Sequence, residues 1–169
     1  MLREFVPEPA YSTTDDDTVY ALLSRRAQKN PDDLIAQWQD DETRQWHDVT
    51  AGQMLARVRA VAKGLIGLGV KAGSMVVIYS PTCYEWGVVD FACAAIGAIY
   101  ETDSAKQAAS IVEEVEPVIA FAGDSVHTQT LEQIRDMHEG LRYVFNFKTD
   151  GLDAVADFGE GVDDDTLDQ

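Results

Sequence analysis

The sequence predicts an α/β fold: a mostly parallel sheet with helices on both faces, preceded by a β-hairpin. Three observations lead to this prediction. Short β-branched apolar runs alternate with segments of helical period along most of the chain. Crossover helices between successive strands imply parallel pairing and a sheet that is covered on both faces. Upstream, residues 34–39 and 44–49 form two short runs separated by "DDE", which is typical of a hairpin with one polar face.

The N-terminal region predicts a leader followed by a helix. Residues 1–17 contain two prolines and an acidic run, so we expect an extended leader. Residues 18–29 carry apolar side chains at helical spacing and are followed by an Asn-Pro pair, which predicts a helix that ends there. We expect Thr14 or Asp17 to cap this helix, which accounts for the acidic run without a phosphoacceptor pocket.

Three capping boxes mark later helices. In each, a Ser or Thr and a Gln or Glu three residues later satisfy two N–H groups at a helix start. The pairs are Thr50 with Gln53, Thr82 with Glu85, and Ser104 with Gln107. The first precedes the longest helical pattern in the chain, and the second opens an apolar helix expected over residues 83–96.

Four apolar runs and one further helical segment complete the pattern. "SMVVIY", "AIYET", "PVIAFAG" and "RYVFNF" are each expected to form a strand, and residues 125–137 a helix. Beyond Lys148 the sequence becomes highly charged and rich in small residues, so we expect an acidic tail or linker over residues 149–169. Residues 18–148 are therefore predicted to form one α/β unit.

Composition and charge exclude several classes of protein. A chain of 169 residues fits one domain with a real core. A net charge of −17 repels nucleic acid and anionic lipid, so neither is expected as a partner. No apolar run is long enough to be a transmembrane segment, and the N-terminus has no apolar signal core. We therefore expect a cytoplasmic protein, with Cys83 and Cys93 as two buried thiols.

The glycine-rich stretch "KGLIGLGVKAG" poses the question of a nucleotide site. A phosphate loop needs its glycines after a strand and at a helix start, where backbone N–H groups and the helix dipole face the phosphate. Here the glycines follow the longest helix and precede a strand, so they lie at a helix C-terminus, which disfavours phosphate. We expect Gly69 to be a left-handed C-cap, followed by a turn at Lys71 to Gly73.

The carboxyl end of the "SMVVIY" strand is the favoured place for a ligand, because α/β sheets bind ligands there. Ser80, Thr82 and Tyr84 stand at that point and could line a site, with no glycine to admit a phosphate closely. The histidines lack metal-ligand spacing, no serine lies in a nucleophile elbow, and the acids at 163–165 lack the pattern of a calcium loop. No residue is assigned a catalytic, cofactor-binding or metal-binding role.

Three stretches, taken in order, carry a family resemblance. They are "DDDTVYALLSRRAQKNPDDLIAQWQ", "WHDVTAGQMLARVRAVAKGLIGLGVKAGSMVVIYSP" and "IYETDSAKQ". Together they resemble the beginning of an AMP-forming acyl-CoA synthetase, in the long-chain fatty-acid–CoA ligase branch of the adenylate-forming enzymes. One segment departs from that family, because "GAIY" at residues 97–100 is shorter than the usual segment before the strand. The length of that strand therefore stays open.

The resemblance implies ATP-dependent activation of a carboxylate. An acyl-adenylate forms with release of pyrophosphate, and coenzyme A attacks it to give a thioester; such an enzyme uses ATP, Mg²⁺ and coenzyme A. The family's phosphate-binding loop, which ends in Pro-Lys-Gly, is absent from the sequence, as are its later adenine-binding and acidic motifs and its C-terminal lid. We therefore expect one N-terminal subdomain of a larger adenylate-forming fold, a scaffold and part of an acyl-pocket wall, with no activity and no bound cofactor of its own.

A function of another class stays open: a stand-alone α/β domain whose acidic surface binds a basic partner or a small ligand at the Ser80 end of the sheet. A subdomain of a larger enzyme should instead expose an apolar surface where the remaining domains pack. We expect such a surface to drive formation of homo-oligomers, which sedimentation at high concentration would detect or refute.

Overall fold

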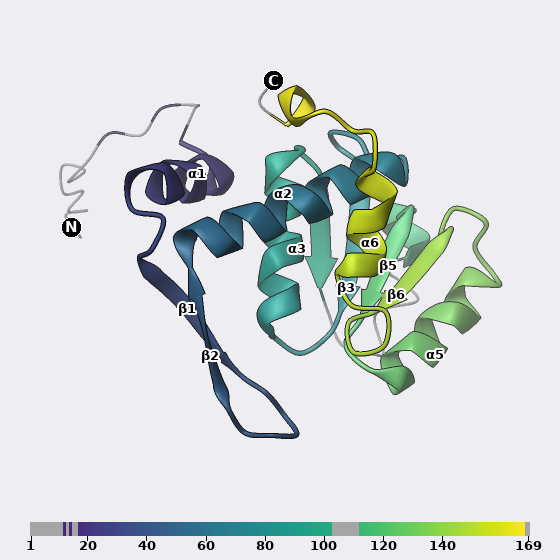
Figure 1. Ribbon diagram of the computed structural model, residues 1–169. Helices are drawn as coiled ribbons and strands as arrows, with labels where there is room; N and C mark the ends of the chain where they lie inside the picture. Colours follow the sequence, from purple (N-terminus) through teal and green to yellow (C-terminus); the bar gives the residue numbers. More distant parts are fainter. Residues whose placement is uncertain (1–11, 13, 15–16, 103–111, 168–169) are drawn as a thin grey trace, which may run out of the picture.

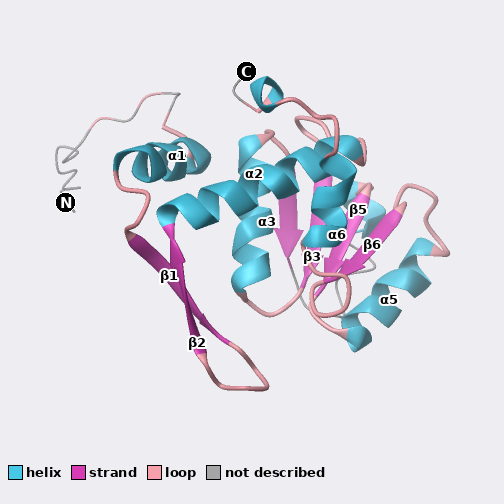
Figure 2. Cartoon of the chain, in the orientation of Figure 1, coloured by secondary structure: helices cyan, strands magenta, loops and turns pink. Residues whose placement is uncertain are grey.

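The computed structural model describes residues 12, 14, 17–102 and 112–167. These residues form a two-stranded antiparallel hairpin and a four-stranded parallel sheet (Figure 1). Helices cover both faces of the parallel sheet (Figure 2), so the predicted fold class is confirmed. Most of the leader predicted over residues 1–17, and the capping box predicted at Ser104 and Gln107, lie outside the described residues.

Helix α1 spans Val19–Lys29 and has Asn30 as its C-cap, as the Asn-Pro signal predicts. Its N-cap is Thr18, whose side chain accepts a hydrogen bond from the first turn. The prediction of Thr14 or Asp17 as the cap is wrong, because the Asp17 carboxylate accepts hydrogen bonds from Thr14 instead. The helix therefore begins one residue later than the acidic run suggested.

The hairpin consists of β1, Leu34–Gln39, and β2, Trp46–Thr50, paired antiparallel. Trp38 of β1 lies opposite His47 of β2. Trp38 is partly buried and packs against the main core, which fixes one face of the hairpin to the body of the protein. The predicted hairpin is confirmed.

The longest helix, α2, spans Ala51–Gly67 and begins with the predicted capping box of Thr50 and Gln53. The second predicted capping box is wrong. Helix α3 spans Tyr84–Ala95, and its N-cap is Cys83, which makes no side-chain cap hydrogen bond. The helix therefore begins one residue too late for a Thr82 side chain to cap it.

Replacing Thr50 with alanine is expected to lower the free energy of unfolding by about 1 kcal/mol, because it removes the oxygen that accepts the Gln53 N–H. Thr82→Ala is the matched control, since it makes the same change where the structure has no threonine cap. Its effect should stay within about 0.5 kcal/mol. Chemical denaturation followed by circular dichroism measures both variants, and equal losses would contradict the assignment of the caps.

The parallel sheet has the strand order β4-β3-β5-β6. Its strands are β3, Met75–Tyr79; β4, Ile99–Thr102; β5, Ile119–Ala122; and β6, Tyr143–Asn146. Helix α5, Ser125–Arg135, connects β5 to β6. Every neighbouring pair is parallel, as the alternation of strands and helices predicts.

Alternate side chains of the central strands enter two separate cores, one on each face of the sheet. Val76 and Ile78 of β3 pack with side chains of α2 and α3. Val77 and Tyr79 pack on the other face, with side chains of α5 such as Leu131. This two-residue period is that of a strand buried on both sides.

Within the described part of the chain, no helix is both long enough and apolar enough to cross a membrane.

The C-terminal segment, residues 149–167, contradicts the prediction that this region lies outside the core. It contains α6, Asp153–Ala156, and two 3₁₀ turns, Asp157–Gly159 and Asp164–Thr166. Leu152, Val155 and Leu167 are buried in the same core as α2. The prediction failed because these few apolar residues are spaced among many acids, which dominate the composition of the segment.

Two glycines in α2 let the C-terminal segment approach the helix backbone. A β-carbon on Gly64 would lie 2.6 Å from the carbonyl carbon of Val155, and one on Gly67 would lie 2.7 Å from that of Phe158. Gly159 is needed on the opposite side, because its β-carbon would lie 2.8 Å from Gly64 N. The two backbones therefore pack at a separation that leaves no room for a side chain between them.

The end of the glycine-rich stretch forms the predicted helix stop. Gly69 has a φ of +90°, and its N–H donates to Ile66 O at 2.9 Å. Leu68 is the C-cap of α2, and Gly69 directly after it has the predicted left-handed conformation, so the predicted helix stop is confirmed with the cap one residue earlier. The turn after it also forms, because Ser74 N donates to Lys71 O at 2.9 Å. The stretch is structural, as predicted, and its first glycines have a packing role that the sequence did not indicate.

Candidate functional site

A cavity of about 860 Å³ lies at the carboxyl ends of β3, β5 and β6. Ser80, Gly123 and Lys148 line it just beyond those strands, and side chains of the hairpin close its other side. This is the edge at which α/β sheets bind ligands, so a cavity forms at the Ser80 end, where the sequence placed a possible site. Gly123 allows two strand ends to meet closely, because a β-carbon there would lie 3.0 Å from Ser80 Cα.

Aromatic and apolar side chains form one wall of the cavity. Trp38 stacks on His47, with ring centroids 4.4 Å apart, and on Tyr84 of α3, with centroids 6.0 Å apart. Met54 of α2 and the buried Phe147, which follows β6, complete this wall. The stack of three rings joins the hairpin to the start of α3.

An ion pair joins the tip of the hairpin to the loop after β6. Lys148 Nζ lies 2.8 Å from Asp41 Oδ2, although the two residues are 107 positions apart. The hydrogen bond between them lowers the pKa of Asp41 and raises the pKa of Lys148. The stabilisation from the lowered Asp41 pKa is present above the unfolded-state pKa and is lost as the pH falls through the folded-state pKa. Both side chains are well exposed, so solvent screens the pair.

The rest of the cavity rim is acidic. Four further acidic residues of the described part of the chain line it: Asp40, Glu42, Glu85 and Asp124. Asp40 accepts a hydrogen bond from Thr43 N, which lowers the pKa of Asp40. Asp124 is the N-cap of α5, and the His127 N–H lowers the pKa of Asp124. The lowered pKa values keep Asp40 and Asp124 ionised at neutral pH.

The two cysteines differ in environment. Cys93 in α3 is buried, and desolvation raises the pKa of its thiol to about 12. Cys83 lines the cavity and is exposed, so the prediction of two buried thiols is wrong for this residue. It lies at the N-cap position before α3 rather than inside the helix. Partial desolvation raises the pKa of Cys83 as well, so neither thiol is an activated nucleophile at neutral pH.

The histidines do not assemble into a site. The ring of His127 meets Tyr79 edge-on, with centroids 4.2 Å apart. Its Nδ1 lies 2.8 Å from Asp124 Oδ1, but the two atoms are not aligned for a hydrogen bond. Among the described residues, no group of three or more His, Cys, Asp or Glu side chains could hold a metal ion.

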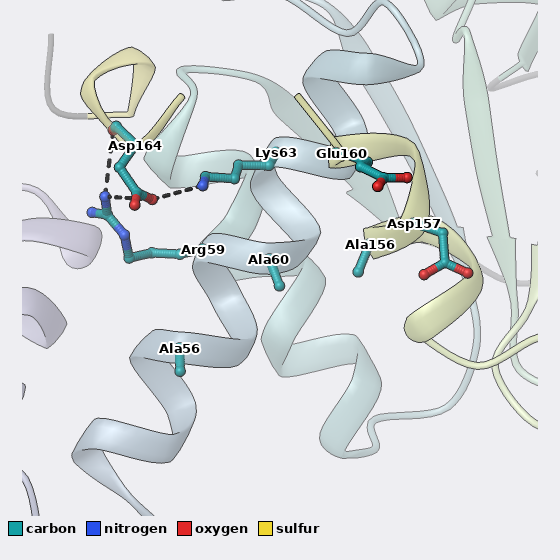
Figure 3. A pocket seen from close by; sticks show the side chains of 9 residues that line it. Ala56, Arg59, Ala60, Lys63, Ala156, Asp157, Glu160 and Asp164 are labelled. Atoms are coloured by element: carbon teal, nitrogen blue, oxygen red, sulfur yellow. Dashed lines mark hydrogen bonds and ion pairs between the residues drawn. The ribbon is translucent and has the colours of Figure 1, made fainter. Parts of the chain in front are cut away.

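A second cavity, of about 850 Å³, lies between α2 and the C-terminal segment (Figure 3). Arg59 and Lys63 of α2 point toward Asp164, at 3.3 Å and 2.7 Å respectively. The two cations, Lys63 foremost, lower the pKa of Asp164. Because both cations of α2 pair with a carboxylate of the C-terminal segment, we interpret this cavity as part of the docking of that segment.

Comparison with known proteins decides the family. Residues 23–161 match the family described as AMP-binding enzyme. The chain belongs to this family. The long-chain-fatty-acid–CoA ligase FadD15 of Mycobacterium bovis is 37% identical over 170 residues, which cover 96% of this chain and 28% of that ligase. The acetyl-coenzyme A synthetase of Phycomyces blakesleeanus is 39% identical over 95 residues, 56% of this chain and 14% of that enzyme.

Solved structures of AMP-binding enzymes have the same fold. A long-chain-fatty-acid CoA ligase from Rhodopseudomonas palustris superposes with a TM-score of 0.68 at 26% identity, covering 78% of this chain and 33% of the other. The N-terminal domain of FACL13 from Mycobacterium tuberculosis also gives 0.68, at 19% identity, over 83% of this chain and 36% of the other. The chain therefore resembles the N-terminal part of a long-chain fatty-acid–CoA ligase, and it spans little more than a quarter of FadD15.

Proposed function

We propose that this chain is the N-terminal, non-catalytic part of an AMP-forming long-chain fatty-acid–CoA ligase and serves as a scaffold. The similarity to FadD15 carries the proposal, because it extends over 96% of this chain. The whole enzyme would convert ATP, a fatty acid and coenzyme A into acyl-CoA, AMP and pyrophosphate, with Mg²⁺ as the metal. Its other domains would supply the adenylation chemistry and pack on the exposed apolar side chains of α1 and the hairpin, such as Val19, Leu22 and Leu34.

Two features support a scaffold rather than a catalytic part. The loop ending in Pro-Lys-Gly, which in this family holds the phosphates of ATP, is absent from the sequence. The glycine-rich stretch that is present ends α2 and leads into β3, at the negative end of the helix dipole.

Both cysteines are free thiols, which fits the cytoplasm as the proposed location.

The purified chain is expected to show no ATP–pyrophosphate exchange in the presence of Mg²⁺ and a long-chain fatty acid. The reason is that exchange requires formation of an acyl-adenylate, and the residues proposed to form it lie outside this chain. A complete acyl-CoA ligase in the same assay is the positive control. Carboxylate-dependent exchange above the rate without protein would overturn the proposal.

The second candidate is a stand-alone acidic α/β domain that binds a ligand or a basic partner. The cavity beside Ser80, with its acidic rim, favours this alternative. Reading the gene downstream of the codon for Gln169 separates the two proposals. Continuation into a Ser/Thr/Gly-rich loop that ends in Pro-Lys-Gly supports the ligase, whereas a stop codon supports the stand-alone domain.

A further inference from the structure

We propose that the cavity between the hairpin and the carboxyl edge of the sheet binds a small organic cation, an ammonium group on an apolar body. This inference does not depend on the ligase proposal, because it rests on the charge and shape of the cavity alone. It assigns the cavity a ligand of opposite charge to a fatty acid or a nucleotide.

The charge around the cavity decides the sign of the ligand. Among the residues that the structure describes, five acidic residues and one lysine line it, so the formal charge of this lining is one minus five, or −4. The ammonium, Lys148, is already paired with Asp41. An anion placed here would face the four carboxylates that do not pair with Lys148, and each repulsion strengthens as water is excluded from the cavity.

The helix N-termini at this edge do not reverse that sign. The first turn of α3 and the N-cap of α5 line the cavity, and a helix N-terminus carries about half a positive charge. Asp124 caps α5, and Glu85 lies in the first turn of α3. Each helix therefore already has its own carboxylate, and the cavity remains a site for a cation.

The walls add selectivity for an organic cation over a metal ion. Trp38, Tyr84 and Phe147 present apolar surface inside the rim, and Trp46 lines the cavity with 64% of its surface exposed. Aromatic faces attract ammonium groups, and apolar walls favour the alkyl part of such a ligand. The structure thus combines a charged rim and an apolar interior, which suits an amphiphilic amine.

Two of the carboxylates are available for a charge contact with the ligand. Glu42 lies at the tip of the hairpin and Glu85 at the start of α3, on opposite elements that line the cavity. Neither serves as a helix N-cap, and neither pairs with Lys148. We therefore assign to Glu42 and Glu85 the contact with the ammonium group.

The test compares three probes with the same eight-carbon chain: octyltrimethylammonium, octanoate and octanol. Binding to the full chain is measured by isothermal titration calorimetry and by tryptophan fluorescence, to which Trp38 and Trp46 of the cavity lining contribute. We expect octyltrimethylammonium to bind at least tenfold more tightly than octanoate, with octanol between them. Equal or tighter binding of octanoate, or no binding of the cation, would overturn the proposal.

A matched pair of variants separates a specific site from general attraction to an acidic protein. The double variant Glu42→Gln, Glu85→Gln should lose at least tenfold in affinity for the cation, from about fivefold for each carboxylate removed. The control double variant Glu139→Gln, Glu160→Gln also removes two negative charges from the net charge of −17. Both of its positions are exposed, and neither lines the cavity. Its affinity should stay within twofold of the original. An equal loss in both double variants would show that the cation binds non-specifically.

Discussion

Replacing Gly64 with alanine is expected to lower the free energy of unfolding by about 3 kcal/mol, the upper range for overpacking a tight interface. The new methyl group would lie 2.6 Å from the carbonyl carbon of Val155, and backbone cannot move aside as a flexible side chain can. Alanine is the better helix former by about 1 kcal/mol, so propensity alone predicts the opposite sign. A loss of stability would therefore show that packing against the C-terminal segment outweighs helix propensity at this position.

Gly87→Ala in α3 provides the matched control for this prediction. A β-carbon at Gly87 would meet no atom within 4 Å, so only the helix propensity changes. This variant should be more stable by about 0.5 to 1 kcal/mol. Urea denaturation followed by tryptophan fluorescence measures both variants. If Gly64→Ala were as stable as Gly87→Ala, the close approach of the C-terminal segment to α2 would be wrong.

Replacing Leu152 with alanine is expected to lower the free energy of unfolding by about 2 to 5 kcal/mol, the range for a buried leucine. Leu152 is 1% exposed and packs in the core that contains α2. A leucine in a solvated acidic tail would give almost no loss. Leu22→Ala on α1 is the control, because Leu22 is 55% exposed and its change should stay within about 0.5 kcal/mol.

The double variant Gly64→Ala, Leu152→Ala tests whether both residues act through one contact. If each single change displaces the same segment from α2, the double variant should lose less stability than the sum of the two single losses. Losses that add within about 0.5 kcal/mol would show that the two residues act independently. Both measurements use the same urea denaturation as the single variants.

The elements of this fold could be predicted because their signals are local. The β-branched run of β3, the apolar period of α2 and the pair of Thr50 and Gln53 each lie within a few consecutive residues. Regular alternation then gives a parallel sheet without knowledge of any contact. The predictions that failed depend on single-residue offsets, such as Cys83 rather than Thr82 as the N-cap of α3.

The docking of the C-terminal segment could not be predicted, because nothing near Leu152 or Val155 indicates their partner. The prediction of a tail rested on the average composition of residues 149–169, which is acidic. Burial depends instead on where a few apolar residues fall along short helical turns. The sequence likewise predicts that Gly64 and its neighbours end a helix. In the structure Gly64 instead allows close packing of the backbone at Val155, far along the chain.

The position of the candidate site could be predicted from topology, since ligands bind at the carboxyl edge of parallel strands. Ser80 therefore pointed to the edge of the sheet where the cavity lies. Its composition could not be predicted, because Trp38 comes from the hairpin and Lys148 from the loop after β6. The pair of Lys148 with Asp41 joins positions that share no sequence signal.

The docking of α6 on α2 also has a consequence for biosynthesis. Arg57 and its partner Asp153 are 96 positions apart, so the ribosome needs roughly 5 to 20 s to add the second after the first. During that interval the face of α2 around Gly64 has no covering segment, whatever the speed at which the helix itself forms. Proteolysis of arrested nascent chains would reveal this interval as cleavage near α2 that disappears once residue 167 has emerged. The nascent protein therefore exposes this face of α2 until the C-terminal segment has been synthesised.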